Sequence, residues 1–143
     1  MEYLVATDGS AVSDTAIEHA AEQAGLVDAD LKIVHVLTPE TELVDGQVVL
    51  PGEDAALEQG ERIVEHAARL AKDVVEGFET DVECTTELLT GRPADAITTH
   101  AEEQGFDSIY VGHRGLSDRS EYVVGSVAKT VVDKTTVPVT IVK

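Results

Sequence analysis

The sequence predicts one α/β domain, residues 1–143, built on a doubly wound parallel sheet of five strands with helices on both faces. Two observations support this fold class. Five runs of β-branched and other apolar residues alternate with four segments of helical apolar spacing along the 143 residues. All of these runs except the third are almost continuously apolar, as expected for parallel strands buried on both faces.

The expected strands are residues 3–7, 31–37, 82–89, 108–112 and 137–142. Strict alternation with helices implies right-handed crossovers, which leave few topologies possible. The longest stretch with neither pattern is residues 38–52, which we interpret as a lid or a mobile loop.

Four helices are expected between these strands. The first begins after Ser10, a favourable N-cap residue, and ends at Gly25, where a C-terminal cap glycine belongs. The second spans about residues 53–76, the third opens with Pro93, and the fourth opens with Gly125. The four prolines all fall at the ends of elements, in agreement with this assignment.

The charge balance is strongly acidic, with 28 acidic and 10 basic residues and a formal net charge of −18. A surface this negative repels nucleic acid and anionic lipid, so neither is an expected partner. Acidic residues occur in every segment, and aromatic residues make up only 3% of the chain. We interpret this pattern as the surface of a halophilic protein, adapted to concentrated salt.

Cellular location is predicted from features that the sequence lacks. No apolar run approaches the ~20 residues that a membrane-spanning helix needs, and the first residues lead into a strand rather than a secretory signal. The one cysteine, Cys84, excludes an internal disulfide and a multi-cysteine metal site, and we expect it to be a small buried apolar residue. These features predict a cytoplasmic protein.

The most informative segment joins the fourth strand to the fourth helix, where Gly112 and Gly115 are followed, after nine residues, by Gly125 and Ser126. Glycines let backbone N–H groups approach phosphate oxygens, and a helix N-terminus adds unpaired donors and the positive end of its dipole. Basic residues outnumber acidic ones in this segment: Arg114, Arg119 and Lys129 against Asp118 and Glu121. From the spacing alone, a phosphate-binding loop and an ordinary strand-to-helix loop are equally open.

Asp8 stands at the carboxyl end of the first strand. Its carboxylate could accept hydrogen bonds from an adenine amino group or from ribose hydroxyls, but aspartate here is also a good cap for the first helix, and the local sequence favours the cap. Ligands of open α/β sheets bind beyond the carboxyl ends of strands, which is where Asp8 and the glycine segment both lie.

Common catalytic motifs are missing: there is no P-loop, no Gly-x-Gly-x-x-Gly after the first strand and no nucleophile elbow. The five histidines show no paired spacing that would hold a metal. His35, in the second strand, is expected to be a hydrogen-bonded core residue rather than a base, whereas His113 could contact a phosphate.

Along nearly its whole length the chain resembles the universal stress protein family. The resemblance rests on Gly112, Gly115, Gly125 and Ser126 at the family's spacing, and on residues 5–10, 91–97 and 137–139. It implies a Rossmann-like sheet in the order 3-2-1-4-5, with Asp8 and Gly112 flanking one crevice. The glycine motif also implies the branch of the family that binds ATP.

The resemblance implies the ligand set as well. Ala6, Thr7 and Val36 would line an adenine pocket, and Asp8 would be a nucleotide ligand. The ribose and phosphates would be surrounded by Gly112, Arg114, Gly115, Gly125, Ser126 and Val127. His113 is a further candidate, but many relatives have a small polar residue at its position, so its role is left open.

Two functions remain open: an ATP-binding module for stress response or signalling, and a slow ATP hydrolase or nucleotidyl-transferring enzyme. The first is favoured, because the sequence offers no convincing general base and no carboxylate pair for Mg²⁺ or Mn²⁺ beyond Asp8 and nearby acids such as Asp118. The apolar final strand at the sheet edge, like the resemblance, predicts a homodimer through that strand; the alternative is a monomer whose edge is protected by Pro138.

Overall fold

A computed structural model describes residues 1–37, 42–44, 47–49, 53–114 and 124–143. Its main sheet has five strands, all paired in parallel, in the order β5-β2-β1-β6-β7. Numbered by their sequence order within this sheet, the strands run 3-2-1-4-5, which confirms the expected Rossmann-like α/β fold. The elements are β1 (Glu2–Ala6), α1 (Ala11–Val27), β2 (Asp30–Leu37), α2 (Glu53–Val75), β5 (Cys84–Thr90), α3 (Pro93–Glu103), β6 (Ser108–Gly112), α4 (Ser126–Lys134) and β7 (Val139–Val142).

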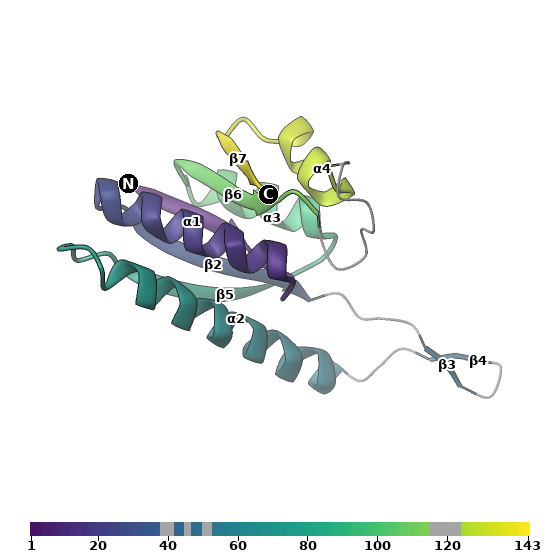
Figure 1. Cartoon of the computed structure of the whole chain (residues 1–143). Helices are drawn as coiled ribbons and strands as arrows, with labels where there is room; N and C mark the ends of the chain where they lie inside the picture. The colour runs from purple at the N-terminus through teal and green to yellow at the C-terminus, as the bar shows by residue number, and fades with distance from the viewer. Residues whose placement is uncertain (38–41, 45–46, 50–52, 115–123) are drawn as a thin grey trace.

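The sheet separates two apolar clusters. Helices α1 and α2 cover one face, and α3 and α4 cover the other (Figure 1). Successive residues of a strand point to opposite faces, so Leu4 belongs to one cluster and its neighbour Val5 to the other. On its buried side α1 presents Ala16, Ala20 and Ala24, all fully buried, and such small side chains let the helix approach the sheet closely.

The chain changes its winding direction at β1. This strand pairs with β2 on one side and with β6 on the other. The connection that leaves β1 enters α1 on one face, whereas the connection that leaves β6 enters α4 on the opposite face (Figure 1). The two connections therefore diverge at the carboxyl ends of neighbouring strands, which is the arrangement that forms a crevice in open α/β sheets.

The predicted end of the first helix at Gly25 is wrong. Helix α1 continues to Val27 and is capped by Asp28, which takes the left-handed conformation at φ 57° and ψ 43°. Gly25 lies inside the helix, and a Cβ on it would come within 2.7 Å of Cδ2 of Phe78. A glycine is needed there because an aromatic ring packs against the helix, and not because the helix ends.

The stretch from 38 to 52, predicted to be irregular, contains a short antiparallel hairpin. Its strands are β3 (Glu42–Val44) and β4 (Gln47–Val49), and it projects away from the main sheet (Figure 1). The sequence between the two strands is Asp45-Gly46, a pair that favours two-residue hairpin connections. The remaining residues of this stretch lie outside the described part of the chain. No helix among the described residues is both long and apolar enough to span a membrane.

Candidate functional site

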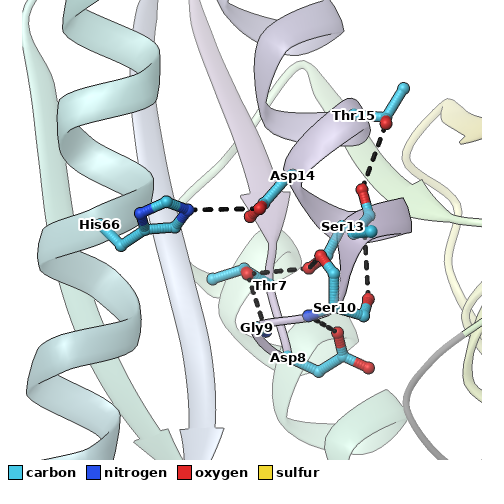
Figure 2. Close-up of polar contacts among 9 residues, drawn as sticks. Thr7, Asp8, Gly9, Ser10, Ser13, Asp14, Thr15 and His66 are labelled. Atoms are coloured by element: carbon cyan, nitrogen blue, oxygen red, sulfur yellow. Dashed lines mark hydrogen bonds and ion pairs between the residues drawn. The ribbon is translucent and has the colours of Figure 1, made fainter.

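The turn between β1 and α1 carries a compact set of hydrogen bonds (Figure 2). Ser10 is the N-cap of α1, as predicted, and its Oγ accepts a hydrogen bond from the N–H of Ser13 at 3.2 Å. One carboxylate oxygen of Asp8, Oδ1, accepts from the N–H of Ser10 at 2.9 Å. Asp8 thus supports the turn that leads into the cap, while Ser10 itself caps the helix.

Thr7 fixes the start of the same turn. Its buried hydroxyl oxygen accepts from the N–H of Gly9 at 3.1 Å and lies 3.0 Å from Oγ of Ser13. Since Ser13 Oγ donates its single proton to the carbonyl of Ser10, at 2.8 Å, Thr7 must be the donor to Ser13. The hydroxyls thus form a directed chain from Thr7 through Ser13 to the carbonyl of Ser10.

The second half of the candidate site begins where β6 ends. A Cβ on Gly112 would lie 2.9 Å from Cγ1 of Val12, so this glycine lets the first turn of α1 pack against the strand. The next residue, His113, is buried; its N–H donates to the carbonyl of Val142 at 2.8 Å, and its own carbonyl accepts from the N–H of Gly125 at 2.5 Å. Its Nδ1 is buried and has no hydrogen-bond partner among the described residues.

Gly125 is the N-cap of α4 and has a φ of −64° and a ψ of 158°, which any residue can adopt. Its position therefore does not require glycine for a left-handed backbone. The following residues Ser126 and Val127 are exposed, and N–H groups of a first helical turn have no acceptor within the helix. Arg114 is half-buried. Gly115, like Asp118, Arg119 and Glu121, lies outside the described residues.

The structure brings the two halves together because β1 and β6 are neighbours. Of the other predicted residues, Ala6 ends β1 and Val36 lies in β2; both pack with the apolar cluster on the α3 and α4 face. The N–H of Thr7 donates to the carbonyl of Val34 at 2.9 Å, so the turn after β1 also stays attached to β2.

His35, expected to be a hydrogen-bonded core residue, is hydrogen-bonded but only half-buried. Its Nδ1 lies 2.8 Å from the carbonyl oxygen of Thr7. Sequence reasoning missed this partner, because Thr7 is 28 positions away and nothing in the local pattern around either residue links them.

A second cluster of charged groups lies on β2, β5 and α3. Glu87 is 3.4 Å from Nζ of Lys32 and 3.1 Å from Nε2 of His100, and burial lowers the pKa of His100 even though Glu87 acts in the opposite direction. A cleft of about 520 Å³ between β5 and α3 is lined by Glu87, Arg92 and His100, among others, and by none of the predicted nucleotide-site residues. Among the described residues, no three His, Cys, Asp or Glu side chains gather as a metal site would require.

Cys84, predicted to be a small buried apolar residue, is only half-buried. Burial raises the pKa of its thiol, with a smaller opposing effect from Lys72.

Fold and site together define an open parallel α/β protein with a polar turn and a glycine-containing connection at its topological switch point. The sequence pattern of the universal stress protein family matches residues 2–143. The chain belongs to the universal stress protein family.

Curated relatives agree with this assignment. The chain is 34% identical to universal stress protein YxiE of Bacillus subtilis, over 98% of this chain and 97% of the relative. It is 31% identical to universal stress protein MJ0531 of Methanocaldococcus jannaschii, over 98% and 80% of the two chains.

Solved structures show the same fold. A universal stress protein in complex with cAMP matches with a TM-score of 0.71 and 26% identity, over 100% of this chain and 97% of the other. A universal stress protein of Archaeoglobus fulgidus in complex with dAMP matches with a TM-score of 0.75 and 24% identity, over 100% and 98%.

Proposed function

We propose that this protein binds ATP and acts as a nucleotide-dependent module in a stress response or in signalling. The observation that carries the proposal is the topological switch point: Asp8 lies in the turn after β1 and Gly112 ends β6, so both stand at the carboxyl ends of neighbouring strands. The glycine spacing Gly112, Gly115, Gly125 and Ser126 supports it. So does the similarity to a universal stress protein that was solved with cAMP, another adenine nucleotide.

In this proposal Ala6, Thr7 and Val36 line the adenine pocket, and Asp8 accepts from the adenine or the ribose. Residues of the second half surround the ribose and phosphates: Gly112, Arg114, Gly115, Gly125, Ser126 and Val127. Because the imidazole of His113 is buried, we assign this residue a role through its backbone, whose N–H and carbonyl join β7 and α4 to the end of β6.

The direct test is to denature the purified protein and to identify any nucleotide that it releases. Calorimetry on the emptied protein with ATP, ATP and Mg²⁺ or Mn²⁺, cAMP and GTP then ranks the ligands. ATP should be released or should bind more tightly than GTP. A protein that carries no nucleotide, and that shows no heat with any of these ligands, is not a nucleotide-binding module.

Three further properties belong to the same proposal. We propose that residues 1–143 act as one universal stress protein domain, that two copies associate through β7, and that the acidic surface is an adaptation of a cytoplasmic protein to molar salt. The last point has a simple check: a halophilic protein should lose its folded, monodisperse state when salt is removed. If it stays folded and monodisperse in dilute buffer, the halophilic interpretation fails.

A further inference from the structure

The hydrogen bond between His35 and Thr7 connects the proposed site to the second helix. The carbonyl oxygen of Thr7 can only accept, so Nδ1 of His35, 2.8 Å away, must carry the hydrogen. The ring is also close to α2, because a Cβ on Gly60 would lie 3.4 Å from its Cδ2. The imidazole of His35 therefore sits between α2 and the end of β1.

The Thr7 carbonyl needs a donor from outside the regular ladder, because β1 ends at Ala6. The other polar groups of Thr7 are already engaged: the N–H with the carbonyl of Val34 and the hydroxyl with Gly9 and Ser13. With His35 on the carbonyl, each hydrogen-bonding group of Thr7 has a partner within the protein.

Anchoring this carbonyl has a consequence for the next residue. A peptide unit is planar, so fixing the C=O of Thr7 also fixes the direction of the N–H and the Cα position of Asp8. The side chain of Asp8 is fixed separately, because its carboxylate accepts a hydrogen bond from the N–H of Ser10. The backbone and the side chain of Asp8 are thus both oriented before any ligand arrives.

We infer that His35 is a positioning residue of the nucleotide site, acting through the Thr7 carbonyl to preorganise Asp8. This inference rests on the proposed function. His35 needs no contact with the nucleotide for this role. Both the neutral Nδ1–H tautomer and the protonated ring carry a hydrogen on Nδ1, so the anchor is retained in either state.

Two variants separate the hydrogen bond from the volume of the side chain. His35→Asn places an amide N–H₂ close to the position of Nδ1 and keeps a donor, whereas His35→Leu fills similar space without one. His35→Leu should bind ATP about fivefold to tenfold more weakly, the effect of one neutral hydrogen bond, and His35→Asn should stay within about twofold of the parent. Calorimetry measures both, with circular dichroism as a check on folding.

A spectroscopic measurement tests the anchor without any nucleotide. In ¹⁵N-labelled parent protein at neutral pH, the imidazole nitrogens of His35 should show the Nδ1–H tautomer. An Nε2–H tautomer overturns the inference, and so does a folded His35→Leu that binds ATP as tightly as the parent. If instead the parent binds no nucleotide while the Nδ1–H signal is present, the proposed function fails, and with it the positioning role, although the anchor itself stands.

Discussion

The ring of Phe78 packs on the backbone of Gly25, so closely that a Cβ on the glycine would lie 2.7 Å from Cδ2 and 2.8 Å from Cγ of the ring. These ring atoms lie near the base of the Phe78 side chain and cannot move aside as a flexible chain end could. Helix α1 and the segment after α2 are therefore matched in shape at this point.

Gly25→Ala should destabilise the protein despite the better helix propensity of alanine. Propensity favours alanine by about 1 kcal/mol, but overpacking a close contact costs about 1–3 kcal/mol. We expect a net loss in the free energy of unfolding, measured by denaturant titration. In a Phe78→Leu background the same change should be neutral or stabilising. Equal losses in both backgrounds would mean that the ring is not the cause.

Gly125→Val should abolish ATP binding and leave the fold intact. The φ and ψ of Gly125 are open to valine, so the backbone need not strain, whereas a branched side chain at the start of α4 would occupy space beside the proposed phosphates. Calorimetry in molar salt measures the binding, and circular dichroism confirms the fold. A folded Gly125→Val that keeps the parent affinity would remove the phosphate site from this connection.

Removing the Arg114 side chain should weaken ATP binding less than Gly125→Val does. Arg114→Ala should weaken ATP binding by no more than about 1.5–3 kcal/mol, the range of one hydrogen bond to a charged group. The matched control is Arg69→Ala on the exposed side of α2, which should have no effect.

Asp8→Ala should reduce the preference for ATP over GTP more than it reduces phosphate affinity. An unchanged preference would contradict the role given to Asp8.

The dimer proposal is tested at the two edges of the sheet. Strand β7 is one edge and β5 is the other. Thr140→Lys in β7 should weaken the dimer, because a charge on an edge strand opposes pairing with a second chain. Thr85→Lys, at an exposed position of β5, is the control and should leave it unchanged. Light scattering in high salt should give twice 15.2 kDa for the parent; a monomer at micromolar concentration contradicts the proposal.

Burial of His100 predicts a loss of stability in mild acid. The lowered pKa means that the unfolded chain binds this proton more readily than the folded protein does. The free energy of unfolding should therefore fall as the pH drops through the ordinary histidine value of 6.5 toward the lower folded value. His100→Asn should flatten this slope between pH 7 and about pH 5.5.

Glu87 gives the complementary variant for the same measurement. Its carboxylate raises the pKa of His100 against the effect of burial. Glu87→Gln should therefore steepen the fall in stability over the same pH range. If neither variant changes the slope, His100 does not control it.

Turnover distinguishes a binding module from an enzyme. We expect ATP hydrolysis far slower than the ~10 s⁻¹ of a typical enzyme, with Mg²⁺ or with Mn²⁺. Labelled ATP and pure protein provide the assay. Sustained turnover near one per second, lost in Asp8→Ala, would support an ATP hydrolase instead.

The regular elements were predictable because their signals are local. Apolar runs and helical spacing predicted the five sheet strands and four helices, and wherever the sequence predicted the end of an element, the observed end lies within two residues of it. The sheet order came from the family resemblance, since alternation alone leaves several parallel orders open. The hairpin of β3 and β4 was missed because its strands have only three residues each, too few to show a period.

Contacts between distant segments were not predictable from one sequence. Gly25 looked like a helix end because the local pattern does not include Phe78, which packs on it from beyond α2. His35 was expected to be hydrogen-bonded. That its partner is the carbonyl of Thr7, next to Asp8, follows from the pairing of β1 with β2 and not from the local sequence. In both cases a local preference was compatible with two explanations, and the tertiary contact decided between them.

The division of the core by the sheet affects how this sequence can diverge. Leu4 and Val5 are adjacent in the chain, yet each is packed in a different cluster with different helices. Substitutions that share no partners add their effects on stability almost independently. Substitutions behind one face of the sheet should therefore add their effects on stability to those behind the other face wherever the two sites are well separated, so each half of the core can change its packing largely by itself.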